Sequence, residues 1–125
     1  MAIINHEHCV SLEVAKLLKE AGFDWEIKTF YFMGQIGETM LGDAKNHNFS
    51  NQFISAPTLA VAQQWLMEVK NIDVFAYRNE PKDKFESIVS FNKKWSTTGM
   101  CINTYEEALE TAIKKALETI LEKGE

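Results

Sequence analysis

The N-terminal segment holds side chains that bind metal ions. His6, His8 and Cys9 stand almost side by side, and imidazole nitrogen and thiolate sulfur are ligands of zinc and similar cations. A complete site would have to recruit His47 and Cys101 from distant parts of the chain. Structural zinc sites usually take a ligand pair from each of two segments, and this spacing departs from that pattern. We therefore expect no metal or other cofactor, with Cys9 packed against the core; a metal shared by the three histidines and Cys101 is the alternative.

A second group combines basic and aromatic side chains. Lys93, Lys94 and Trp95 are consecutive, and Arg78 belongs to the neighbouring predicted strand. In such groups an aromatic ring stacks on a base while the cations neutralise phosphates. The net charge of -5 and the single arginine disfavour general nucleic-acid binding. These four residues are our candidate contact with a partner, and weak binding of single-stranded nucleic acid is the alternative. The purely structural interpretation places Trp95 at the rim of the core.

No group of residues carries the signature of an enzyme. Gly34, Gly37 and Gly42 lack the following Gly-Lys-Ser/Thr of a phosphate-binding loop. The segments around Cys9 and Cys101 match no nucleophile motif, and no serine has the Gly-x-Ser-x-Gly context. Most carboxylates fall on the solvent faces of predicted helices. We therefore predict a non-enzymatic protein.

Length and composition indicate one globular domain, residues 1–125. The chain is 46% hydrophobic and 25% charged, which is ordinary for a globular protein. No apolar run approaches the about 20 residues of a membrane-spanning helix, and the N-terminus lacks the features of a signal peptide. We predict a cytoplasmic protein without a membrane partner, in which Cys9 and Cys101 are free thiols rather than a disulfide.

Three segments carry the signals of amphipathic helices. Residues 11–21 begin with a capping serine and are followed by Gly22, which suits the left-handed end of a helix. Residues 104–121 begin with a Thr-x-x-Glu capping box and have a broad apolar face. The middle helix is expected from Ser55 or Ala56 to Val69, with Pro57 in its first turn. Its apolar stripe consists of Leu59, Ala62, Leu66 and Val69, with Trp65 covering the edge of the stripe.

Strands are expected between these helices. Residues 25–32, 72–77 and 85–91 are rich in aromatic and β-branched side chains, and the polar residues 79–84 predict a hairpin between the last two. Residues 52–54 are a candidate short strand pairing back against residues 25–32. The rest of residues 33–53 is expected to be a long loop.

The expected order is therefore α-β-α-β-β-α. Because regular β-α-β alternation is missing and one hairpin is expected, we predict an α+β fold. Its three helices pack on one face of a small, mainly antiparallel sheet.

Several segments resemble a family of small proteins without known activity. The matching segments are residues 15–24, 54–58, 62–68 and 104–110. They are similar to uncharacterised proteins encoded by phages and prophage-like elements of gut bacteria. The resemblance implies an accessory protein of a mobile element, and it supplies no catalytic, cofactor or binding residue.

The aromatic content is the remaining indication of function. Eight phenylalanines, three tryptophans and three tyrosines are more than one small sheet face buries. We expect an interaction module that binds an unidentified protein partner, or itself as a homodimer, through an exposed aromatic sheet surface and the long loop.

Overall fold

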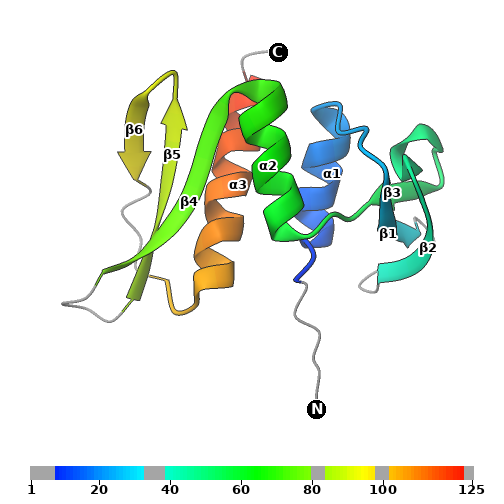
Figure 1. The fold of residues 1–125 in the computed structure, drawn as a ribbon, viewed down its shortest axis with the longest axis horizontal. Helices are drawn as coiled ribbons and strands as arrows, with labels where there is room; N and C mark the ends of the chain where they lie inside the picture. Colours follow the sequence, from blue (N-terminus) through cyan, green and yellow to red (C-terminus); the bar gives the residue numbers. More distant parts are fainter. Residues whose placement is uncertain (1–7, 33–38, 80–83, 98–101, 123–125) are drawn as a thin grey trace.

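The protein is layered, with its helices between two small sheets. The computed structural model describes residues 8–32, 39–79, 84–97 and 102–122. The described residues form three helices and two three-stranded antiparallel sheets (Figure 1). The helices are α1 (Leu12–Glu20), α2 (Leu59–Lys70) and α3 (Tyr105–Glu122). The strands are β1 (Ile27–Phe32), β2 (Thr39–Lys45), β3 (Phe53–Ser55), β4 (Ile72–Asn79), β5 (Lys84–Phe91) and β6 (Lys94–Thr97), and a short 3₁₀ helix η1 covers His47–Phe49.

The predicted α+β class, the three helices and the antiparallel pairing are confirmed. The strands divide into two sheets, ordered β2-β1-β3 and β4-β5-β6, rather than joining in the single sheet that we expected. Helix α3 lies against β4 and β5, α2 lies against β4 and α3, and α1 lies against α3 and β3. Because the helices have apolar residues facing both sides, they form a layer that keeps the sheets apart (Figure 1).

The first sheet contains both a confirmed and a missed strand. The short strand expected near residues 52–54 is confirmed as β3, which pairs Phe30 with Ser55 and Phe32 with Phe53. The expectation of a long loop over residues 33–53 is wrong, because this range contains β2 and η1. Strand β2 is exposed along most of its length and therefore lacks the alternation of apolar and polar residues that marks a half-buried strand.

The outer face of the first sheet is covered by η1. The His47 ring stacks on Phe30 with its centroid 4.2 Å away, and His47 Nε2 lies 3.2 Å from the carbonyl oxygen of Asp43. At Gly42 a Cβ atom would lie 3.0 Å from Cε1 of Phe30, so the absence of a side chain allows this close approach. The buried His47 is therefore a packing residue of this sheet.

Helix α1 begins and ends as its sequence indicates. Ser11 Oγ accepts a hydrogen bond from the Val14 amide at 3.3 Å. At the other end Gly22 has a φ of +97°, and the Phe23 amide donates to the Leu18 carbonyl at 2.9 Å. This is the Schellman arrangement, in which a left-handed residue lets the chain turn back and satisfy the last carbonyls. Phe23 is consequently buried under the last turn.

Helix α2 begins later than expected. Its cap is Thr58, whose hydroxyl accepts from the Val61 amide at 3.2 Å. Pro57 precedes this cap, so its expected place in the first helical turn is wrong. The physical reason is strand pairing, since Ser55 ends β3 and the Ala56 amide donates to the Thr29 carbonyl at 3.0 Å.

The buried side of α2 also differs from the predicted stripe. Trp65 is only 1% exposed and lies in the centre of the core, whereas Val69 is 52% exposed. The Trp65 ring meets Phe23 edge to face, with centroids 5.4 Å apart. A helix with neighbours on two sides buries a wider arc than a helix that packs on one face. The centre of the buried face of α2 is therefore at Trp65 and not on the predicted four-residue stripe.

Helix α3 covers the second sheet and anchors α1. Thr104 Oγ1 accepts a hydrogen bond from the Glu107 amide at 3.1 Å. This confirms the bond of the capping box in which the side chain of the cap residue satisfies a free amide of the first turn. Lys114 forms an ion pair of 3.0 Å with Glu13 of α1, and Glu110 Oε2 accepts from the Ser11 amide at 2.7 Å. Across the described ranges, none of the helices has both the length and the apolar character required to cross a bilayer.

The chain before α1 is fastened across the core. The Val10 amide donates to the Pro57 carbonyl at 2.9 Å, and the hydroxyl of Tyr31 donates to the Val10 carbonyl at 2.8 Å. Val10 is fully buried, and Cys9 has a free thiol whose sulfur lies 3.8 Å from Thr29 Oγ1. The expectation that this segment packs against the core is therefore confirmed.

We predict that replacing Gly22 by alanine lowers the free energy of unfolding by about 1 kcal/mol, because a left-handed φ strains any residue with a Cβ atom. No atom lies within 4 Å of a Cβ placed there, so the cost comes from the backbone and not from crowding. Urea denaturation measures it. Gly22→Asn is the control and should lose less stability, since asparagine tolerates this region better; equal stability of wild type and Gly22→Ala would contradict the prediction.

We also predict a loss of stability at alkaline pH that depends on Tyr31. Burial, and after it the charges of Cys9 and Glu110, raise the pKa of Tyr31 above its ordinary value of 10.0. The unfolded chain then loses this proton at a lower pH than the folded chain. Stability should therefore fall as the pH rises through about 10 and toward the higher folded pKa.

The comparison of wild type with Tyr31→Phe isolates this effect. At neutral pH the variant should be less stable by about 1 kcal/mol, because the hydrogen bond to Val10 is lost. Above pH 10 the difference should shrink, since phenylalanine cannot ionise. Urea unfolding at a series of pH values measures it, and a difference that stays constant would show that Tyr31 does not titrate in this way.

Candidate interaction surface

The second sheet has one covered and one exposed face. Val74 and Val89 point toward α3 and are each 1% exposed. The alternate positions form what we call the outer face, where Phe75 pairs with Ile88. On the third strand Trp95 pairs with Ser90 and therefore lies on the same outer face.

Trp95 is the most prominent side chain of the outer face. It is 63% exposed, so the interpretation that places it at the rim of the core is wrong. Its ring meets the Phe75 ring edge to face, with centroids 5.2 Å apart. The two rings belong to β6 and β4 and lean over the intervening β5, where Ser90 is only 2% exposed. The indole is thus held in position by Phe75 while most of its surface faces solvent.

A tight turn places Trp95 there. Asn92 and Lys93 connect β5 to β6 and have φ angles of +55° and +69°. Two positive φ angles in a two-residue loop are the mark of a type I′ hairpin turn. Asparagine favours this conformation, but lysine adopts it rarely. Because no glycine follows Asn92, the sequence lacks the usual signal, and β6 was not predicted as a strand.

The two edges of this sheet differ. At the β4 edge Gln63 of α2 donates from Nε2 to the Val74 carbonyl at 2.7 Å and covers the strand. At the other edge all residues of β6 are exposed. Since Phe91 and Lys94 flank the two-residue turn as a hydrogen-bonded pair, the N–H and C=O of Trp95 point away from β5. The β6 edge is therefore open to another strand at Trp95.

A groove of about 390 Å³ lies between α2 and the outer face. Its apolar surface comes from Met67, Phe75 and Trp95, and Met67 is 49% exposed. Polar groups at its sides come from Gln64 and Asp73. The groove is large enough for one or two side chains of a partner, beside an indole that offers further apolar area.

The four candidate contact residues do not converge. Lys93, Lys94 and Trp95 lie together on the hairpin. Arg78 pairs with Phe85 at the far end of β4, about 20 Å along the strand from Ile72 at 3.3 Å per residue. It also lies on the face opposite to Trp95, with its guanidinium 5.2 Å from the Phe85 ring centroid. The candidate site is therefore the hairpin and the groove, without Arg78.

The histidines and the cysteine that the structure describes do not gather into a metal centre. His47 is buried in the first sheet, and His8 lies before α1 with its carbonyl bonded to the Leu59 amide at 2.9 Å. His6 and Cys101 lie outside the described residues. In the part of the chain that is described, no three histidine, cysteine or acidic side chains gather as metal ligands do.

The segments that suggested a family lie mostly in the helices and not on this surface. Residues 15–24 and 104–110 belong mainly to α1 and α3, and residues 54–58 and 62–68 to β3 and α2. Comparisons of the chain with models of protein families, with curated proteins and with solved structures found no match. The role of the outer face is therefore argued from its own geometry.

We predict that truncating the two tryptophans has very different costs. Trp65→Ala should lower the free energy of unfolding by about 3–5 kcal/mol, because it leaves a large cavity. Trp95→Ala should cost about 1 kcal/mol, since it loses mainly the ring contact with Phe75. Urea denaturation measures both. A loss at Trp95 as large as that at Trp65 would show that Trp95 serves the fold and not a partner.

Proposed function

We propose that this chain is a small, non-enzymatic interaction module that binds a protein partner through the hairpin and groove of the second sheet. The observation that carries the proposal is Trp95, a large aromatic side chain that is 63% exposed yet held against Phe75. Tryptophan is frequent among the residues that dominate binding energy, because it offers a large rigid surface at little entropic cost.

Three features of the surface support this function together. The groove next to Trp95 can receive apolar side chains. The outward N–H and C=O of Trp95 can pair with an extended segment of the partner, as in strand addition. Lys93 in the turn and Lys94 on the opposite face of β6 place positive charge on the same hairpin as the indole, in a chain whose net charge is -5. This charge favours a partner with acidic groups near the hairpin.

The setting of the module is part of the proposal. The resemblance of residues 15–24, 54–58, 62–68 and 104–110 supports an accessory protein of a phage or other mobile element. The free thiol of Cys9 supports a cytoplasmic location. A second copy of the chain is one form that the protein partner can take.

The alternative function is weak binding of single-stranded nucleic acid. Lys93, Lys94 and Trp95 are adjacent and support it, because an exposed ring can stack on a base. Arg78 lies at the other end of the sheet, so an oligonucleotide would have to bind on the hairpin alone. The small number of cations at this place favours the protein partner.

The test compares wild type with Trp95→Ala and with Phe49→Ala. Phe49 belongs to η1, which lies against β3 of the first sheet, and its side chain is 90% exposed. Light scattering over a range of concentrations measures self-association, and affinity capture from host lysate identifies other partners. Wild type and Phe49→Ala should bind the same protein or themselves, and Trp95→Ala should bind at least about tenfold more weakly.

Two results would overturn the proposal. One is a strict monomer that captures no protein; the other is binding that Trp95→Ala leaves unchanged. Tryptophan fluorescence at low salt with a thymidine oligonucleotide tests the alternative. Quenching that disappears in Trp95→Ala and in the double variant Lys93→Glu, Lys94→Glu would favour nucleic acid as the ligand.

A further inference from the structure

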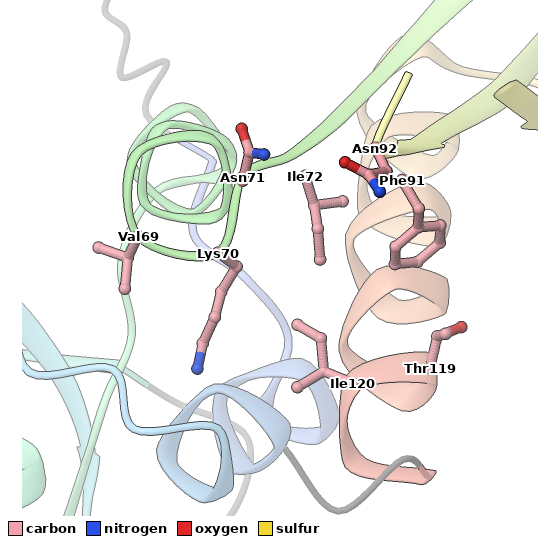
Figure 2. A pocket seen from close by; sticks show the side chains of 8 residues that line it. All are labelled: Val69, Lys70, Asn71, Ile72, Phe91, Asn92, Thr119 and Ile120. Carbon is pink, nitrogen blue, oxygen red and sulfur yellow. The ribbon is translucent and has the colours of Figure 1, made fainter. Parts of the chain in front are cut away.

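A second cavity lies where α2 and α3 end. It is a cleft of about 550 Å³, bordered by the end of α2, the start of β4, the turn after β5 and the last turns of α3 (Figure 2). The residues that line it are Val69, Lys70, Asn71, Ile72, Phe91, Asn92, Thr119 and Ile120. None of them lines the groove beside Trp95, so the two cavities are separate.

The interior of the cleft is apolar. Ile72 and Ile120 form its inner surface and are 5% and 6% exposed, and the Phe91 ring lies beside them (Figure 2). Val69 forms part of the wall on the α2 side.

The polar groups of the cleft lie at separated places. Lys70 contributes the only charged side chain of the lining, and its ammonium lies 5.6 Å from the centroid of the Trp65 ring. Among the described residues, no carboxylate forms an ion pair with Lys70. The carboxamides of Asn71 and Asn92 lie on either side of Ile72, and the lysine ammonium points away from both (Figure 2). The cation is thus separated from the amides.

The charge of Lys70 decides which ligand fits. The last carbonyls of α2 and α3 carry partial negative charge near the cleft, of about half an elementary charge per helix end. This field weakens within one turn, and Lys70 itself compensates it at the end of α2. The lysine ammonium is a full charge on a flexible side chain, so it can move to meet an anionic group.

We propose that the cleft binds a small organic carboxylate with an apolar body, such as a short aryl-alkyl acid. The carboxylate would pair with the Lys70 ammonium, and the apolar body would cover Ile72 and Ile120. Small-molecule sites commonly measure about 300–1,000 Å³, and this cleft falls in that range. Its apolar residues Ile72 and Ile120 are surrounded by the polar residues Lys70, Asn71, Asn92 and Thr119.

The experiment uses 4-phenylbutyrate and its neutral amide, 4-phenylbutyramide, as probes of the same size. Because Lys70 lies over the Trp65 ring, tryptophan fluorescence reports on the cleft, and NMR shifts of the Asn71 and Asn92 side-chain amides locate the ligand. Wild type should show saturable binding of the acid. Lys70→Gln should bind the acid at least about tenfold more weakly, with little change for the neutral amide.

Matched variants separate this cleft from other effects. Lys16→Gln removes an exposed lysine of α1 that does not line the cleft and should bind like wild type. Trp95→Ala should bind the acid as wild type does. The test of the cleft is therefore independent of whether Trp95 binds a protein partner. No saturable binding of the acid to wild type, or equal binding of the acid by wild type and Lys70→Gln, would overturn the proposal.

Discussion

The structure depends on the burial of one helix, α2, which packs against β4 and α3. Trp65 at its centre is almost fully buried and packs edge to face against Phe23 from the end of α1. Its indole nitrogen has no hydrogen-bond partner in the described part of the chain. An unsatisfied buried donor costs about 1–3 kcal/mol. The burial of a side chain of this size contributes more, since its truncation typically costs about 3–5 kcal/mol.

The position of α2 fixes both sheets. Before the helix, Pro57 accepts from Val10, which ties the N-terminal segment to the first sheet through Tyr31. Within the helix, Gln63 bonds to the edge of β4 and closes one side of the second sheet. Because α3 covers the remaining inner face, the surfaces left for a partner are the outer face and the β6 edge. The candidate interaction surface is therefore a consequence of how the helices are stacked.

The parts of the fold that could be predicted are those determined by local chemistry. The caps at Ser11 and Thr104 and the left-handed Gly22 depend on a few neighbouring residues, and the structure has them where expected. Pro57 was misplaced because proline is acceptable both in a first helical turn and just before it. The choice was made by the pairing of β3 with β1, which a local pattern does not contain.

The candidate site likewise has a part that the local sequence predicts and a part that depends on strand pairing. The order of residues alone identified Lys93, Lys94 and Trp95, because these three are consecutive in the sequence. Arg78 was grouped with them because its strand is adjacent, but the register that puts it at the opposite end comes from the full hairpin. Strands β2 and β6 are exposed along most or all of their length, so neither has the apolar alternation from which strands are predicted.

The hairpin turn also joins the two cavities. Asn92 lines the cleft between the helix ends, and three residues later Trp95 borders the groove. Lys93 between them holds a φ of +69°, a conformation that costs a lysine more than a glycine. The strand pairing on both sides of the turn must therefore hold Lys93 in place. Where a ligand of the cleft changes the affinity for a partner on Trp95, thermodynamic linkage requires that partner to change the affinity of the cleft by the same factor.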